Sequence, residues 1–179
     1  DPLAPNLENI EIIEIDDQVG YGAEGQYVSL AVDNQANVLH LAYYDANQKE
    51  LKYAQVAISD WIIEKDTIDN EGDDVGKYAS LALDREGIPH IIYYAQNESG
   101  GALKYAYGDS NNEGDWLIEV VDRGEEVGSY SSIAVYNLSI EFENDLSIPH
   151  IAYTAKIGED WIVKHATRKG IMNAIEPNF

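Results

Sequence analysis

The sequence predicts an all-β protein that is built from three copies of one repeat. A block of residues that begins with tyrosine occupies 27–33 and returns at 78–84 and 130–135. Runs rich in β-branched and aromatic residues alternate with clusters of Gly, Asn and Asp, which is typical of strands joined by turns. No segment has the i, i+3, i+4, i+7 apolar spacing of an amphipathic helix, so we expect little helix.

Three further blocks follow each tyrosine block, and they give the repeat a period of about 50 residues, within the range of propellers and solenoids. The second block contains a His and ends in Tyr, at 39–44, 89–94 and 149–153. The third contains Lys, at 51–54, 103–106 and 163–166. The fourth begins with Trp, at 61–64 and 116–119. Four short strands per repeat is the composition of a β-propeller blade.

The blocks predict the strands in chain order. The first repeat has expected strands at 27–33, 38–45, 50–56 and 61–68. The second has them at 78–84, 89–95, 102–107 and 116–122. The third, which carries a polar insertion, has them at 130–136, 149–155, 161–167 and 171–175. A run at 10–16 precedes the first repeat, and its Ile12-Ile13-Glu14 matches Ile62-Ile63-Glu64, so it is a candidate spare outer strand.

These strands predict an N-terminal extension at 1–16, blade 1 at 17–68, blade 2 at 69–122, and blade 3 with a C-terminal tail at 123–179. Closed propellers have roughly four to eight blades, and this chain supplies three. Either two chains close a six-bladed ring as a homodimer, or the chain is a fragment of a longer propeller. We favour the dimer, because open blade faces would expose large apolar patches.

Charge and composition exclude several classes of function. The 179 residues carry 33 Asp and Glu against 11 Lys and Arg, a formal net charge of -22. Such an acidic surface repels phosphate backbones, so we expect no nucleic-acid partner. The absence of cysteine excludes disulfides, thiolate metal sites and a Cys nucleophile. No apolar run approaches the roughly 18 residues of a membrane helix, so we expect no membrane insertion.

The repeated tyrosines are the candidate ligand-binding residues. Tyr rings at a shared propeller mouth can stack on sugar rings and donate hydrogen bonds from their phenol groups. Three of these tyrosines begin the expected innermost strands, two end the expected second strands, and one follows a lysine. The candidate set is therefore Tyr27, Tyr78, Tyr130, Tyr44, Tyr94 and Lys77. The alternative is that the repeat places them only for packing between blades.

Three other groups of residues are weaker candidates for a ligand or metal site. His40, His90 and His150 occupy equivalent places in different blades, which separates them too far to share a metal, so a structural hydrogen bond is the favoured interpretation. Trp61 and Trp116 are expected to pack between blades. Asp69, Asp73 and Asp74 lie in an acidic loop whose oxygens could bind calcium. The loop lacks the spacing of a known calcium motif, so we favour a solvated loop over a calcium site. No other cofactor is expected.

The sequence holds no recognised catalytic motif. Nucleophile-elbow, zinc-protease and phosphate-loop patterns are all absent. Tyr and His could serve as a base for a lyase, but cations that would neutralise a uronate are scarce, and Arg85, Arg123 and Arg168 do not cluster in the repeat. We therefore expect a protein that is not an enzyme, with enzymatic action on polysaccharide as the alternative.

The repeat V-G-x-Y-x-S-L-A-x-D-x-x-G-x-P-H-I-x-Y-Y, followed by L-K-Y-A and a Trp, resembles the tandem β-propeller repeats of bacterial and archaeal secreted or surface proteins. The residues at 75–94 and 103–106 match it best. Related propellers include lectins, sialidase-like proteins and polysaccharide lyases, and the fold alone does not decide among them. The resemblance implies an extracellular or cell-surface binding module for carbohydrate or protein. A polysaccharide-acting enzyme and a purely structural domain of a larger surface protein are the alternatives.

Overall fold

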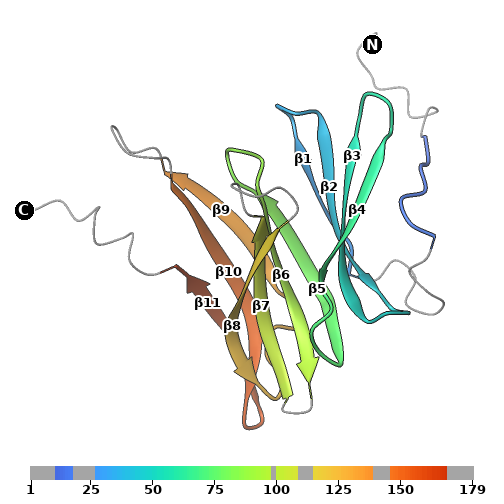
Figure 1. Cartoon of the computed structure of the whole chain (residues 1–179). Coiled ribbons are helices and arrows are strands. Elements are labelled where there is room, and N and C mark those ends of the chain that lie inside the picture. Colours follow the sequence, from blue (N-terminus) through green and yellow to red (C-terminus); the bar gives the residue numbers. More distant parts are fainter. Residues whose placement is uncertain (1–10, 18–26, 98–99, 109–114, 139–145, 169–179) are drawn as a thin grey trace, which may run out of the picture.

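The computed structural model describes residues 11–17, 27–97, 100–108, 115–138 and 146–168 (Figure 1). In these ranges the chain forms eleven strands and no helix. The strands make three antiparallel sheets that follow one another along the chain. The predicted all-β class is therefore confirmed. No helix of the described ranges is long and apolar enough to cross a membrane.

Within each sheet, every strand pairs with its neighbour in the sequence. The first sheet contains β1 (Ser29–Asp33), β2 (Val38–Asp45), β3 (Glu50–Ala57) and β4 (Ile63–Asp69). The second contains β5 (Asp74–Leu83), β6 (Pro89–Asn97), β7 (Gly100–Gly108) and β8 (Trp116–Gly124). The third contains β9 (Ser132–Leu138), β10 (Leu146–Ile157) and β11 (Asp160–Thr167). Figure 1 shows the sheets side by side, in the order of the sequence.

The three sheets share one strand register. The same alanine faces the repeated histidine in each: Ala31 pairs with His40, Ala82 with His90 and Ala134 with His150. The first two sheets also shift register at equivalent points, between Leu51 and Lys52 and between Leu103 and Lys104. The sequence repeat is therefore a repeat of hydrogen-bonded structure.

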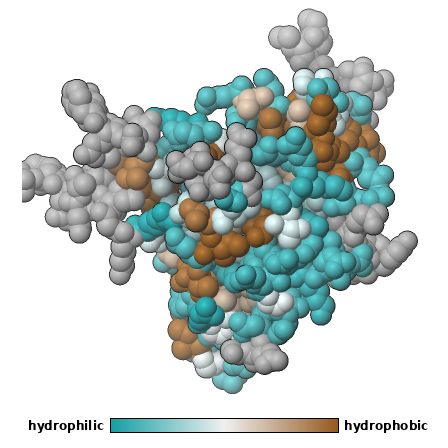
Figure 2. Space-filling model, viewed as in Figure 1, coloured by the Kyte–Doolittle hydropathy of each residue, from teal (hydrophilic) through white to brown (hydrophobic). Residues whose placement is uncertain are grey.

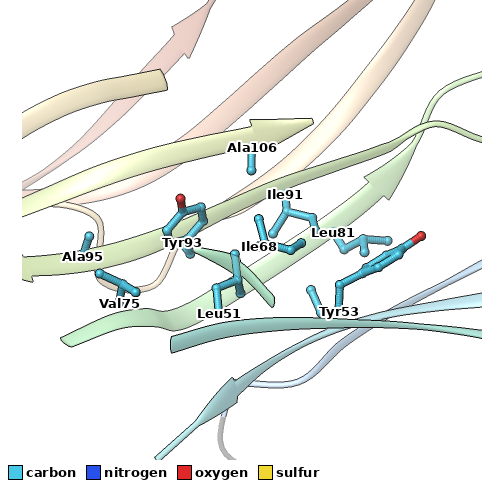
Figure 3. Packing of buried hydrophobic residues seen from close by; sticks show 10 residues of the cluster. Leu51, Tyr53, Ile68, Val75, Leu81, Ile91, Tyr93, Ala95 and Ala106 are labelled. Atoms are coloured by element: carbon cyan, nitrogen blue, oxygen red, sulfur yellow. The ribbon is translucent and has the colours of Figure 1, made fainter. Parts of the chain in front are cut away.

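The hydrophobic core lies between neighbouring sheets. Leu51, Tyr53 and Ile68 of the first sheet pack with Leu81 and Ile91 of the second (Figure 3). A second cluster joins the second sheet to the third and includes Leu103, Tyr105, Ile133, Ile151 and Tyr153. Because a sheet face is buried only where another sheet covers it, the contact between sheets provides most of the apolar burial.

A carboxylate that is buried or partly buried accompanies each of these contacts. Asp69 ends β4 and accepts hydrogen bonds at Oδ2 from Tyr93 Oη and Lys104 Nζ of the second sheet, both at 2.7 Å. Asp122, near the end of β8, accepts from Tyr153 Oη at 2.8 Å and Lys164 Nζ at 2.7 Å in the third sheet. We call these two residues, together with Asp16, the junction carboxylates.

Asp16 occupies the corresponding place in front of the first sheet. Its Oδ2 accepts a hydrogen bond from Tyr43 Oη at 2.7 Å, and its Oδ1 lies 2.9 Å from Lys65 Nζ. Tyr43, Tyr93 and Tyr153 are the same repeat position. The N-terminal segment therefore contacts the first sheet as β4 contacts the second.

Several predicted strand boundaries are wrong. Tyr27 and Tyr130 lie outside strands because their backbone is left-handed, and pairing begins two residues later, at Ser29 and Ser132. The second inner strand instead starts at Asp74 and passes through Tyr78 with shifts in register. The spare strand expected at 10–16 is not a strand over the described residues 11–16. The strand expected at 171–175 lies outside the described residues.

The pairing of Trp61 with Trp116 as equivalent positions is also wrong. Ile63 pairs with Val56, and Trp116 pairs with Gly108, which is the repeat position of Val56. Ile63 is therefore the equivalent of Trp116. Trp61 lies two residues before β4, with a left-handed φ of 59° and 40% exposure. The sequence alignment missed this because the pattern W-x-I-E occurs at both 61–64 and 116–119, whereas the first Trp lies two residues before its strand.

Asp69→Ala should lower the free energy of unfolding by about 3–5 kcal/mol, as expected when one partner of a buried ion pair is removed. The Asp69 side chain is 1% exposed, and its loss leaves Tyr93 Oη without its acceptor and Lys104 Nζ with the Glu71 carbonyl oxygen in place of an ion pair. Urea unfolding measures the change. Glu119→Gln is the control, since Glu119 and Arg168 form an exposed pair whose loss costs less than about 1 kcal/mol. Equal effects from the two variants would contradict the junction role of Asp69.

Candidate functional site

The three inner tyrosines share an unusual backbone conformation. Tyr27, Tyr78 and Tyr130 have φ angles of 63°, 55° and 52°. Bulky residues rarely adopt this left-handed region because Cβ crowds the backbone. The same conformation at the same place in three sheets means that each tyrosine is held by its surroundings and that its ring is aimed in a fixed direction.

A glycine before two of these tyrosines brings the inner strand close to the preceding sheet. Gly76 has a φ of 106°, and a Cβ there would lie 2.8 Å from the Leu51 Cα. Gly128 has a φ of 94°, and a Cβ there would lie 3.0 Å from the Leu103 Cβ. Only glycine fits both the conformation and the space, so the V-G-x-Y pattern places the tyrosine loop against its neighbour.

The structure brings the five predicted tyrosines together in one group. The ring centroids of Tyr27 and Tyr78 are 4.5 Å apart, and those of Tyr78 and Tyr130 are 5.3 Å apart. Tyr44 lies 6.1 Å from Tyr27, and Tyr94 lies 6.3 Å from Tyr78, both edge to face. These are ordinary distances for interacting aromatic rings. We call these five residues, which span all three sheets, the tyrosine cluster.

Lys77, the sixth predicted residue, lies beside the cluster and is already paired. Its Nζ is 2.5 Å from Asp74 Oδ2 and 5.4 Å from the centre of the Tyr44 ring. Tyr44 Oη donates a hydrogen bond to Asp74 Oδ1 at 2.7 Å. Asp74 therefore uses both oxygens to hold Lys77 and Tyr44.

The phenol groups of Tyr44, Tyr78 and Tyr94 remain protonated at neutral pH. Burial and the hydrogen bond to Asp74 raise the pKa of Tyr44. The hydrogen bond with Tyr27, together with burial, raises the pKa of Tyr78, and burial raises that of Tyr94. A proton-abstracting tyrosine needs a lowered pKa, so these groups are suited to donating hydrogen bonds and to stacking.

Exposure divides the cluster into a supporting part and an accessible part. Tyr44 is 7% exposed, whereas Tyr130 is 75% exposed. In the third sheet Thr154 takes the place of Tyr44 and Tyr94, and its hydroxyl donates to the Ser129 carbonyl oxygen at 2.5 Å. The ring of Tyr130 therefore lacks the edge-to-face tyrosine that supports the other two, and it presents most of its surface to solvent.

Each repeated histidine bonds inside its own sheet. His40 Nδ1 is 2.5 Å from Tyr53 Oη, and His90 Nδ1 is 2.5 Å from Tyr105 Oη. His150 Nδ1 lies 3.1 Å from His165 Nε2. The sequence predicts that this hydrogen bond holds the adjacent turn; its partner is instead a side chain of the neighbouring strand.

The three candidate calcium ligands have different surroundings. Asp69 is buried at the junction between sheets, and Asp74 holds Lys77 and Tyr44. Asp73 is exposed. Within the described ranges, no three His, Asp or Glu side chains gather into a metal-binding group. Calcium binding by these residues stays a prediction.

Sequence reasoning missed a cleft of about 530 Å³ between the first two sheets. Trp116, Lys104, Arg123, Asn70 and Gln96 are among its lining residues. Trp116 packs edge to face on Tyr53 at 4.9 Å and donates a hydrogen bond to Asp66 at 3.1 Å, so it joins the sheets as predicted. A corrected alignment of the fourth strands is the signal that could have placed Trp116 there.

No protein-family model matches the chain, and no curated protein does. Among solved structures, the chain is similar to a fucose lectin from Kordia zhangzhouensis in complex with methyl-fucoside. The two are 19% identical, with a TM-score of 0.47, and the match covers 80% of this chain and 92% of that chain. A TM-score of this size does not establish a shared fold.

Burial of His40 predicts a loss of stability in mild acid. Burial lowers the pKa of His40, so the unfolded chain, in which histidine titrates near about 6.5, binds this proton first. The stabilising contribution of neutral His40 is complete above that pH and decreases as the pH falls below it. Urea unfolding between pH 8 and pH 5 should show a smaller decrease for His40→Gln than for the unchanged chain. Equal decreases would show that His40 is not held neutral.

Proposed function

We propose that the three sheets are consecutive blades of a β-propeller and that the chain is a non-catalytic binding module for carbohydrate. The tyrosine cluster is the proposed binding surface. In support, the sheets are successive antiparallel meanders with one register, and the apolar core lies between them. This is how blades pack around a propeller axis. The repeat resemblance to secreted and surface proteins supports an extracellular location.

The observation that carries the proposal is the gathering of the tyrosines from three sheets. Stacked and edge-to-face rings offer flat apolar faces, on which the C–H face of a sugar packs. Protonated phenols, together with the paired Asp74 and Lys77, offer donors and acceptors for hydroxyl groups. Carbohydrate sites combine these two features.

The net charge of the chain limits the class of ligand that we propose. At -22, the protein repels polyanionic ligands at low ionic strength. Lys77, the cation beside the cluster, is neutralised by Asp74. Neutral sugars are therefore the favoured ligands. An enzyme that acts on uronate polymers would need an available cation and a tyrosine base, and the described cluster supplies neither in the required state.

Tyr130→Ala should weaken binding of a neutral glycan at least about tenfold, the equivalent of about 1.4 kcal/mol. Its ring is accessible, so the loss comes from the ligand contact and not from the core. A glycan array identifies a ligand, and titration calorimetry compares the variants. Tyr136→Ala is the matched control, since Tyr136 is 54% exposed in β9 and has no ring contact with the cluster among the described interactions.

Two results would overturn this proposal. If Arg123→Ala abolished binding while Tyr130→Ala did not, the ligand would lie in the cleft beside Trp116. If incubation with uronate polymers released unsaturated sugars, the chain would be a lyase. Tyr78→Ala complements the test, because unfolding of that variant would assign the half-buried Tyr78 to packing.

A further inference from the structure

One repeat position is buried in the first two sheets, where a following sheet covers it, and exposed in the third sheet. Leu51 in β3 and Leu103 in β7 are both 0% exposed, because the following sheet covers them. Val163 in β11 is the same repeat position and is 79% exposed. Trp161 and His165, its neighbours on this face, are also exposed. The third sheet therefore has a face that is built for a following sheet.

The first sheet has the matching opposite face. Leu81 and Ile133 are 7% and 8% exposed, because each packs on the preceding sheet. Leu30, their equivalent in β1, is 56% exposed. Val28 and Val32 lie on the same side of the strand and are 52% and 43% exposed. In Figure 2, hydrophobic patches interrupt a hydrophilic surface, one of them over the first sheet.

The N-terminal segment and the third sheet are also complementary. The junction carboxylates Asp69 and Asp122 belong to fourth strands, β4 and β8. Asp16 holds the equivalent Tyr43, but residues 11–16 pair with no strand. The third sheet in turn has three strands in its described part, with β11 as its outer edge. Residues 11–16 thus lie where the fourth strand of a preceding sheet would lie.

We propose that these two end faces bind each other in a second copy of this chain. The open face around Val163 covers the open face around Leu30 of the partner, and residues 11–16 pair with the partner's β11. Two copies then form two identical junctions and a ring of six sheets. This inference rests on the proposed propeller architecture and is independent of the proposed carbohydrate.

A second copy fits these faces better than an unlike partner does. Both halves of the missing junction are present in the chain, and the two internal junctions show how they fit. Heterologous faces produce a closed ring when the rotation per unit completes a circle, and two three-sheet units give six, within the usual range for propellers. The charge of -22 per chain opposes association, so binding should tighten as salt screens the repulsion.

Sedimentation of the chain without ligand, at micromolar concentration in moderate salt, tests the proposal. The expected species has twice the 19.9 kDa mass of the chain. Leu30→Glu and Val163→Glu should each give monomers, because one substitution alters both junctions of the pair. Ile157→Glu is the control: Ile157 is 59% exposed in the third sheet but lies on the same side of β10 as the residues that face the second sheet. This variant should remain dimeric.

A mixture of the two variants makes the test sharper. Leu30→Glu combined with Val163→Glu can form a pair in which one junction carries both substitutions and the other carries none. The mixture should therefore dimerise more tightly than either variant alone. A monomeric unchanged chain, or continued growth into long assemblies, would overturn the closed pair. Deletion of residues 1–14, which keeps Asp16, should weaken the dimer at least about tenfold, and unchanged affinity would overturn the strand pairing.

Discussion

The junction carboxylate is the interaction on which the arrangement of the sheets depends. A carboxylate removed from water is costly unless charged and hydrogen-bonding groups surround it. Asp69 meets this requirement with the Glu71 N–H of its own loop at Oδ1 and with Tyr93 and Lys104 of the next sheet at Oδ2. At Asp122, burial raises the pKa, but the bonds from Lys164 and Tyr153 outweigh it and lower the net value. The charged group therefore favours one placement of each sheet on its neighbour, whereas apolar packing alone tolerates small shifts.

Apolar burial between the sheets then supplies the stabilising free energy of this arrangement. Each sheet is a simple meander with an apolar face that must be covered to be removed from water. The faces become stable where Leu51 or Leu103 is covered completely. Consequently the two uncovered ends, at Leu30 and Val163, are places among the described residues where this burial is incomplete. The geometry of the tyrosine cluster depends on the same arrangement, since its rings come from all three repeats.

Much of the fold could be predicted from the sequence because the repeat is regular in its hydrogen bonding. The His-containing strands and the grouping of the tyrosines follow from equivalent positions in the three repeats. The starts of β1 and β9 could not be predicted, since Tyr27 and Tyr130 resemble strand residues and only the backbone reveals their left-handed φ. The equivalence of Ile63 and Trp116 was hidden because the same W-x-I-E letters begin two residues before β4 in the first repeat and at the start of β8 in the second. The junction carboxylates escaped notice because a buried Asp69 and an exposed Asp73 look alike in an acidic loop.

Hydrogen–deuterium exchange along β11 tests the central claim, that the end faces of this chain complete each other, most directly. In β7, the equivalent strand, pairing with β8 satisfies the backbone groups of the outer edge. If residues 11–16 of a partner pair with β11, the outward amides of β11 should exchange slowly at high protein concentration and faster on dilution. Leu30→Glu should abolish this protection while β7 stays protected. Rapid, concentration-independent exchange along the outer edge of β11 in the unchanged chain would contradict the account.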